Sequence, residues 1–268
     1  MKSYQIKNNK TTLANVYQFT DKKTCSLTNI VSEVPEKQAI GFAGFRAKKY
    51  LENYLALYIP NKKIQQNKIT DYQIKNKAKT CLIDCFSIIK STKLELFIFP
   101  TANKFVKNKM DGIAGDTVWK NTILLFIHPD ADWERKFSET LVHEVAHAYS
   151  LNYLERKSLL DYIVFEGLAE HFREHLIGGE MSYWAKTLEK SESLILFDKL
   201  KSKLMTDDFK IRKDVFYAGK TYPLWAGYSI GYYLISDYLK NLPSINWPKI
   251  LKTPPSEIAR DSGWFSTK

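Results

Sequence analysis

The chain of 268 residues is long enough to bury a full hydrophobic core, which excludes the class of small domains that depend on disulfide bonds. It carries 40 Lys and Arg residues against 29 Asp and Glu residues, a formal charge of +11. The excess is mostly lysine scattered along the chain, without an aromatic-basic motif beside it, so we expect a solvated Lys-rich face and no nucleic-acid partner.

The N-terminal stretch and the cysteine count bear on the compartment of the protein. The first twenty residues contain no apolar run of signal-peptide length, and the longest weakly polar run, WAGYSIGYYLI, is too short to span a bilayer. Three cysteines form an odd count, which suits a reducing compartment. We therefore expect a cytoplasmic, soluble protein with no membrane partner, and the oligomeric state stays open.

Apolar residues at near-helical spacing between Glu36 and Tyr58 predict a helix that starts after Pro35. The polar stretch IPNKKIQQNK then breaks the pattern. We therefore place a domain boundary near residue 60, with a helical N-terminal segment over residues 1–60 and a second domain over residues 61–268.

A second helix is predicted from Thr70, which suits an N-cap. An apolar stripe runs along this helix, formed by Ile74, Ala78, Cys81, Leu82, Cys85 and Ile89. Because Cys81 and Cys85 lie in the stripe and their spacing is not C-x-x-C, we interpret them as buried, reduced core thiols rather than as a metal or redox pair.

Two strands are predicted next. LELFIFP (94–100) alternates and stops at a proline, and NTILLFIHP (121–129) is a continuous β-rich run. The stretch between them, DGIAGDTVW (111–119), has the glycines of a loop.

Two long helices follow the strands. Asp130 or Asp132 can cap the first, WERKFSETLVHEVAHAYSL, and Ser158 with Asp161 forms a capping arrangement for the second, LLDYIVFEGLAEHFREHLI, which ends at the glycines 178–179. Strands followed by packed helices are typical of the α+β class. We therefore predict an α+β fold that is mainly helical with a small β-sheet.

The first long helix carries the motif HEVAH, from His143 to His147. Residues four apart project from the same side of a helix, so the two histidines can each place one nitrogen on a single ion. Glu144 can reach a metal-bound water without being a ligand, which is the position of a general base in metal-assisted hydrolysis. Apolar residues surround the trio, and buried polar groups need partners, so the motif predicts a zinc site.

Catalytic zinc takes three protein ligands and leaves the fourth position to water. Glu166 is the candidate third ligand, because two antiparallel helices would bring it to a similar depth as His147. One turn further on, Glu170 can accept the second N–H of a ligand histidine. The alternative is that Glu166 and Glu170 belong to a solvated acidic face.

The remaining histidines are interpreted as structural. HFREH (171–175) fits the inverted H-x-x-E-H pattern of another metallopeptidase class, but it lies in the last turns of its helix. We interpret His171 as a packing or supporting residue, His175 as a surface residue and His128 as structural.

The motifs of the two long helices together resemble those of a known family. HEVAH followed by EGLAE resembles the gluzincins, the thermolysin-like clan. More narrowly, HEVAHAYSLNYL, VFEGLAEHF and LWAGYSIGYYLI resemble the YjaZ-like family of predicted zinc-dependent proteases over approximately residues 65–265. The resemblance implies a zincin-like metallopeptidase domain with Zn²⁺ bound by His143, His147 and Glu166, and Glu144 as the catalytic base.

The sequence departs from the wider clan at two points. Phe165 stands where asparagine often precedes the ligand, and no histidine follows His175. The tetrahedral oxyanion that forms when water adds to a peptide carbonyl needs a hydrogen-bond donor besides zinc. Because no histidine is available, this donor must be a tyrosine, an arginine or a lysine. Our first candidate is Tyr228 and our second is Tyr232, since a tyrosine O–H donates without a charge, although both can simply pack. Glycines 227 and 231 would let another element approach their helix closely.

These observations predict a cytoplasmic zinc metallopeptidase that hydrolyses a peptide or protein substrate. The strand NTILLFI, just before the motif helix, is the candidate edge for pairing an extended peptide. The alternative is a non-catalytic zinc-containing protein, regulatory or nucleic-acid-binding, that uses its basic surface.

Overall fold

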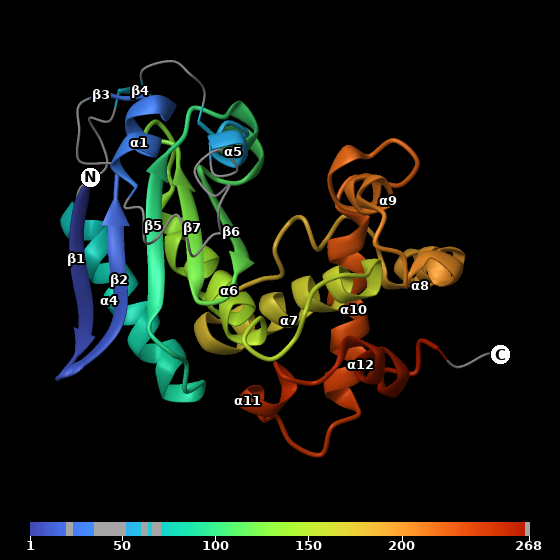
Figure 1. Ribbon diagram of the computed structural model, residues 1–268. Coiled ribbons are helices and arrows are strands. Elements are labelled where there is room, and N and C mark those ends of the chain that lie inside the picture. Colours follow the sequence, from blue (N-terminus) through green and yellow to red (C-terminus); the bar gives the residue numbers. More distant parts are fainter. Residues whose placement is uncertain (20–23, 35–51, 60–63, 66–70, 266–268) are drawn as a thin grey trace. The chain divides into compact units, whose positions relative to one another are not determined.

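The computed structural model describes residues 1–19, 24–34, 52–59, 64–65 and 71–265. The fold is α+β, as predicted, with a five-stranded sheet and long helices (Figure 1). The chain forms two compact units, Met1–Ala148 and Tyr149–Lys268, which are described separately.

The sheet of the first unit has the strand order β1-β2-β5-β7-β6. Its strands are β1 (Lys2–Asn8), β2 (Thr11–Gln18), β5 (Leu94–Pro100), β6 (Ile113–Trp119) and β7 (Thr122–Ile127). The pairs β2–β5 and β5–β7 are parallel, while β1–β2 and β6–β7 are antiparallel hairpins. Two short strands, β3 (Thr24–Cys25) and β4 (Ile64–Gln65), pair separately.

The prediction of a helical segment over residues 1–60 is wrong for its first part, because Lys2–Gln18 forms the hairpin β1–β2. Strand β1 buries little besides Ile6, so its sequence shows no apolar alternation, and Asn9 adopts the left-handed conformation of a tight turn (φ 51°). Residues 27–33 form helix α1 (Leu27–Glu33), capped by Ser26.

The helix predicted between Glu36 and Tyr58 falls mostly outside the described residues. Residues 52–55 are helical in the described part. The domain boundary near residue 60 stays a prediction.

The stretch DGIAGDTVW is not a loop, contrary to the prediction, but contains strand β6. A turn at Asp111 and Gly112, both with positive φ, leads into β6, and Asn121 (φ 56°) turns the chain into β7. The run NTILLFI is a strand as predicted, but it is not an edge strand, since β7 lies between β5 and β6. In the described part of the chain, the two edge strands of this sheet are β1 and β6. Of these two, β6 lies closer in sequence to the helix that carries the HEVAH motif.

Three helices accompany the strands of the first unit: α4 (Asp71–Ile88), α5 (Lys104–Lys109) and α6 (Glu134–Ser150). The predicted stripe on α4 is buried along its length, from Ile74 to Ile89. Cys81 and Cys85 are buried thiols, and burial raises the pKa of both. Their assignment to the core is confirmed, while the predicted cap Thr70 lies outside the described residues.

The second unit is helical. Its α-helices are α7 (Leu159–Ile177), α8 (Lys190–Leu200), α9 (Phe209–Lys213), α10 (Ala226–Lys240), α11 (Trp247–Ile250) and α12 (Pro255–Asp261). The predicted capping box of Ser158 and Asp161 is present at the start of α7, and Gly178 (φ 76°) follows its end.

Helices α7 and α10 approach each other at two glycines. A Cβ added to Gly167 would lie 2.2 Å from the backbone oxygen of Gly231, and a Cβ added to Gly231 would lie 2.2 Å from the backbone oxygen of Ile163. The predicted close approach at glycines 227 and 231 is therefore confirmed, and Phe216 is the neighbour at Gly227. This contact holds α10 against the half of α7 that carries Glu166.

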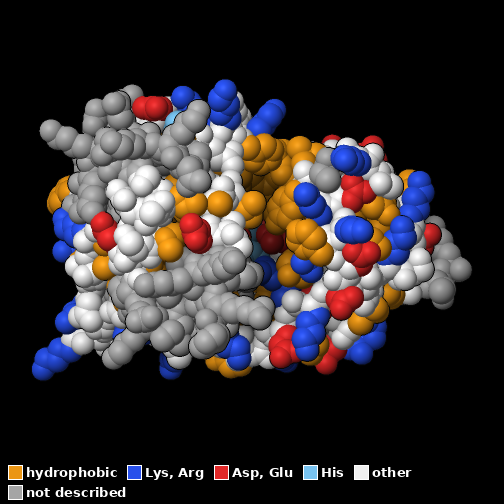
Figure 2. Space-filling view, turned by 45° about the horizontal axis from the view of Figure 1, so that its top comes forward, with side chains coloured by type: hydrophobic (Ala, Val, Ile, Leu, Met, Phe, Trp, Pro, Cys, Tyr) orange, Lys and Arg blue, Asp and Glu red, His pale blue; other side chains and the backbone are white. Residues whose placement is uncertain are grey.

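Charged side chains are mixed on the surface. On the face shown in Figure 2, Lys and Arg side chains are scattered among Asp and Glu side chains, which is typical of a solvated surface. None of the helices in the described ranges has both the length and the hydropathy to cross a bilayer.

Candidate metal centre

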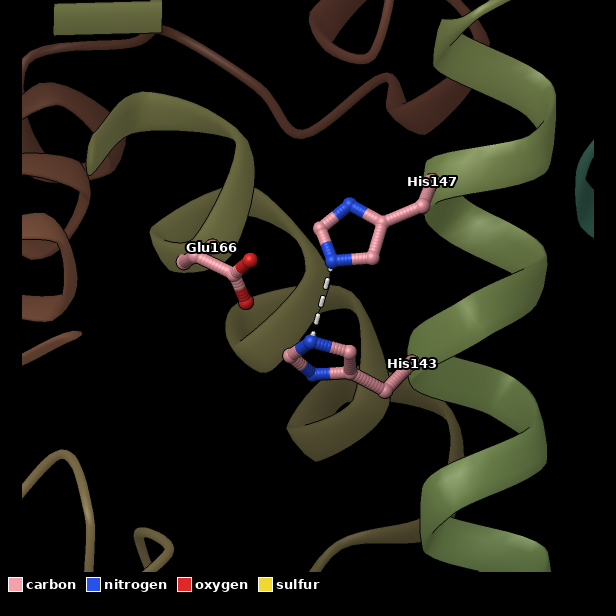
Figure 3. A group of neighbouring side chains, drawn as sticks. All are labelled: His143, His147 and Glu166. Carbon is pink, nitrogen blue, oxygen red and sulfur yellow. Dashed lines mark hydrogen bonds between the residues drawn. The ribbon is translucent and has the colours of Figure 1, made fainter. Parts of the chain in front are cut away.

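Helix α6 places the two predicted histidine ligands next to each other. His143 and His147 lie four residues apart on this helix, and both are buried. Their Nε2 atoms are 3.1 Å apart, with the ring planes at 81° to each other (Figure 3). Two imidazole nitrogens therefore face one point.

Glu166, on α7, is the third member of the group. One ligand atom from each of His143, His147 and Glu166 lies within 4.8 Å of the other two. Figure 3 shows the Glu166 carboxylate turned toward the two imidazoles. The structure thus brings together the three residues that the sequence proposed as ligands.

The donor set and its spacing fit zinc. In a tetrahedral site with zinc bonds of about 2.0–2.1 Å, neighbouring ligand atoms are separated by roughly 3.3 Å. The 3.1 Å between the two Nε2 atoms is close to this value. Two imidazoles and one carboxylate are also the protein ligands of catalytic zinc sites that keep a fourth position open.

Glu144 is held by the edge strand β6. It is buried on α6, and the hydroxyl of Thr117 donates to its Oε2 at 2.7 Å. On the same strand, a Cβ added to Gly115 would lie 2.5 Å from both Cγ and Oε1 of Glu144. The absence of a side chain at Gly115 therefore makes room for the Glu144 carboxylate.

Sequence reasoning missed Gly115 and Thr117 because their stretch was assigned to a loop. The signal was present, since an isolated glycine within a β-like pattern often marks a close approach of another group.

A tyrosine from the N-terminal part of the chain also belongs to the surroundings of Glu144. Burial, with a further contribution from the negative charge of Glu144, raises the pKa of Tyr58 to about 12. Its ring stacks on Phe126 of β7 with centroids 4.0 Å apart. The Tyr58 hydroxyl therefore stays protonated at neutral pH.

Glu170 lies in a buried ion pair. Its Oε1 accepts hydrogen bonds from Arg173 Nη2 at 2.5 Å and from the backbone N–H of Ser182 at 2.8 Å. Only 4% of the Glu170 side chain and 1% of the Arg173 side chain are exposed. The alternative of a solvated acidic face is thus wrong for Glu170, while its predicted role in orienting a ligand histidine stays a prediction.

Arg173 ties the segment after α7 to the helix. It donates to the backbone oxygens of Gly178 and Glu180, each at 3.0 Å. Sequence reasoning did not assign a role to Arg173, because a single arginine in a helix carries no periodic signal.

The other histidines occupy the places predicted for them. His171 stacks on Tyr232 with ring centroids 4.4 Å apart and contacts the Tyr232 backbone oxygen at 2.9 Å, so it is a packing residue. His175 is exposed. His128 is buried, and its Nδ1 accepts the backbone N–H of Asp130.

The two candidate oxyanion donors on α10 have different surroundings. The Tyr228 hydroxyl lies 3.4 Å from the hydroxyl of Tyr217, and the Tyr228 ring meets Phe216 edge-on. The Tyr232 hydroxyl donates to Glu174 Oε2 at 3.2 Å, and burial together with the charge of Glu174 raises the pKa of Tyr232. Because the Tyr232 hydroxyl already donates to a carboxylate, Tyr228 remains the first candidate.

Comparison with known proteins identifies the family. The family described as "Predicted Zn-dependent protease (DUF2268)" matches residues 74–260. The chain belongs to this family. The match contains both histidines, Glu144 and Glu166, and the resemblance noted from the motifs is confirmed. No curated protein and no solved structure matches the chain.

Proposed function

We propose that this protein is a zinc metallopeptidase that hydrolyses peptide bonds, with His143, His147 and Glu166 as zinc ligands and Glu144 as the general base. The observation that carries the proposal is the convergence of three ligand atoms within 4.8 Å, beside a buried glutamate on the same helix as the histidines. Membership in a family of predicted zinc-dependent proteases supports the same reaction class.

In the proposed reaction, the zinc ligands, Glu144 and Thr117 have different roles. Zinc, when bound, would polarise the scissile carbonyl and lower the pKa of the attacking water. Glu144 takes the proton from that water and passes it to the leaving amine. The hydrogen bond from Thr117 to Oε2 fixes the orientation of the Glu144 carboxylate before the substrate arrives. Such preorganisation reduces the rearrangement that catalysis requires.

Strand β6 replaces β7 as the proposed site for pairing an extended peptide. It forms an edge of the five-stranded sheet in the described part of the chain, and it carries Gly115 and Thr117 beside Glu144. A peptide added to a sheet edge is bound through main-chain hydrogen bonds, so the interaction does not depend on one particular substrate sequence.

We expect one zinc ion per chain, with ligand distances of about 2.0–2.2 Å. Single replacements His143→Ala, His147→Ala and Glu166→Ala should each remove stoichiometric zinc, as measured by elemental analysis of the purified protein. The control is His175→Ala, because this exposed histidine lies outside the group. Full zinc content in all three ligand variants would contradict the proposed site.

Gly115→Ala should lower kcat by on the order of 100-fold or more while zinc stays bound, since the new methyl group displaces the carboxylate of Glu144. The double variant Gly115→Ala/Glu144→Asp is the matched control, because a shorter side chain relieves the collision and should regain part of the activity. Zinc content and thermal unfolding are measured alongside. Wild-type turnover in Gly115→Ala would show that the position of Glu144 does not matter.

Tyr228→Phe should lower kcat on the order of 100-fold with zinc retained, if its hydroxyl donates to the oxyanion. Tyr232→Phe is the matched comparison on the same helix, and we expect the smaller effect because the Tyr232 hydroxyl donates to Glu174. Normal turnover in both variants would exclude the tyrosines of α10 and direct the search to an arginine or lysine.

A further inference from the structure

The connection between α9 and α10 contains three irregular backbone features. Residues Asp214–Ala218 form a π-helix directly after α9. Gly219 (φ 59°) and Trp225 (φ 64°) both adopt the left-handed conformation, which is unfavourable for a side chain as bulky as tryptophan. Single π-helical turns and strained residues are common at functional sites. This connection is therefore worth testing for a role in the proposed reaction.

The π-helix buries one aromatic side chain and exposes the next. Phe216 is buried, whereas 57% of Tyr217 is exposed. The ring of Phe216 fills the space that Gly227 leaves on α10, because a Cβ added to Gly227 would lie 2.6 Å from Cε1 and Cζ of this ring. This contact holds the π-helix against the start of α10. As a result, the rings of Tyr217 and Tyr228 lie 6.4 Å apart, and their hydroxyl oxygens are separated by 3.4 Å.

A chain of rings relates these two hydroxyls to the proposed zinc site. The ring of Phe216 lies 5.1 Å from that of Tyr228 and 6.5 Å from that of Tyr162 on α7. Tyr162 and Glu166 are four residues apart on this helix, so they share one face of it. Phe216 therefore joins Tyr228 to the face of α7 that carries Glu166.

Two adjacent hydroxyl groups can act in sequence. Either hydroxyl can donate to the other, because a hydroxyl proton rotates and its oxygen also accepts. When Tyr217 donates to the Tyr228 oxygen, the Tyr228 proton is left to point at another acceptor, and the first hydrogen bond makes it a stronger donor. The distance of 3.4 Å is longer than the usual value of about 2.7–2.8 Å, but catalytic hydrogen bonds of substrate-free enzymes are often long and shorten in the complex.

We propose that Tyr217 is a positioning residue for Tyr228: its hydroxyl donates to the Tyr228 oxygen and directs the Tyr228 proton toward the oxyanion of the tetrahedral intermediate. Both tyrosines keep their protons, so the pair adds two hydrogen bonds to the reaction and no proton transfer. This inference rests on the proposed function, to which it adds a residue that no motif of the sequence indicated.

The alternative is that Tyr217 only packs against Tyr228. Packing needs the ring, which phenylalanine keeps, whereas positioning needs the hydroxyl. Tyr217→Phe is therefore expected to lower kcat on the order of tenfold, as for the loss of one hydrogen bond, with KM and zinc content unchanged. Tyr222→Phe is the matched control and should keep full activity, because Tyr222 lies in the same connection and its hydroxyl accepts from Lys203.

A double-mutant cycle tests whether Tyr217 acts through Tyr228. Adding Tyr217→Phe to Tyr228→Phe should lower kcat no further, since no hydroxyl is left to direct. The second measurement is binding, by titration calorimetry of full-length, zinc-loaded Glu144→Gln protein. Tyr217→Phe in this background should weaken binding of a phosphonate peptide, whose anionic tetrahedral group resembles the intermediate, by about tenfold. Affinity for the uncleaved peptide should not change, whereas a general disturbance of the structure would weaken both ligands.

Three results would overturn the inference while the proposed function stands. They are normal kcat in Tyr217→Phe, an equal loss of kcat in the wild-type and Tyr228→Phe backgrounds, and equal weakening of the phosphonate and the peptide. In each case the wild-type protein still hydrolyses peptide and Glu144→Gln does not. If the zinc-loaded wild-type protein hydrolyses no peptide, the proposed function itself fails, and the role of Tyr217 fails with it.

Discussion

Glu144→Gln is expected to remove peptide hydrolysis while zinc and the fold are retained. Glutamine keeps the shape of the side chain, and its carbonyl oxygen can still accept the hydrogen bond that Thr117 donates. It cannot take a proton from water, however, and general base catalysis contributes about 10²- to 10⁴-fold to the rate. The measurement combines a peptide-library digestion with zinc analysis of the same preparation.

Glu139→Gln is the matched control for this prediction. Glu139 lies on the same helix and pairs with Lys136, so its replacement removes a carboxylate of α6 outside the histidine group. It should keep full activity. Loss of zinc in Glu144→Gln would make Glu144 a ligand, which contradicts the assigned role. If the wild-type protein binds zinc but cleaves no peptide, the alternative of a non-catalytic zinc protein is supported.

Glu170→Ala is expected to lower the free energy of unfolding by about 3–5 kcal/mol, because it leaves the buried Arg173 with only a longer contact, 3.5 Å, to the carboxylate of Glu174 among the ion pairs of the described residues. Arg173 is 1% exposed, so water cannot replace the lost partner without opening the structure. The measurement is chemical denaturation of the metal-free protein, which separates this effect from zinc binding. If Glu170 also orients a ligand histidine, zinc affinity in the folded variant falls about 10- to 100-fold.

The double variant Glu170→Ala/Arg173→Met tests the cause of the instability. It removes both charges, so it should be more stable than Glu170→Ala alone. Glu180→Ala is the surface control, since the Glu180 side chain is exposed and pairs only with Lys186 among the ion pairs of the described residues. Equal stability of Glu170→Ala and the wild-type protein would show that the buried ion pair does not contribute.

Local patterns in the sequence determined the helices that carry the site. The stripe of α4, the capping box at Ser158 and Asp161 and the glycine after α7 depend on residues three or four positions apart, and the structure has them as predicted. The spacing of His143 and His147 belongs to the same class, because one continuous helix sets their relative position. The sequence also predicted the third member of the group, Glu166.

Only the tertiary structure decided which strand accompanies Glu144 and which partner Glu170 takes. Strand β6 was mistaken for a loop because its stability comes from pairing with β7, and β1 was missed because it buries little besides Ile6. The need for glycine at position 115 appears only when α6 lies against β6. The periodicity and the caps of a helix depend on residues that are close in sequence. Strand pairing and buried ion pairs depend on residues that only the fold brings together.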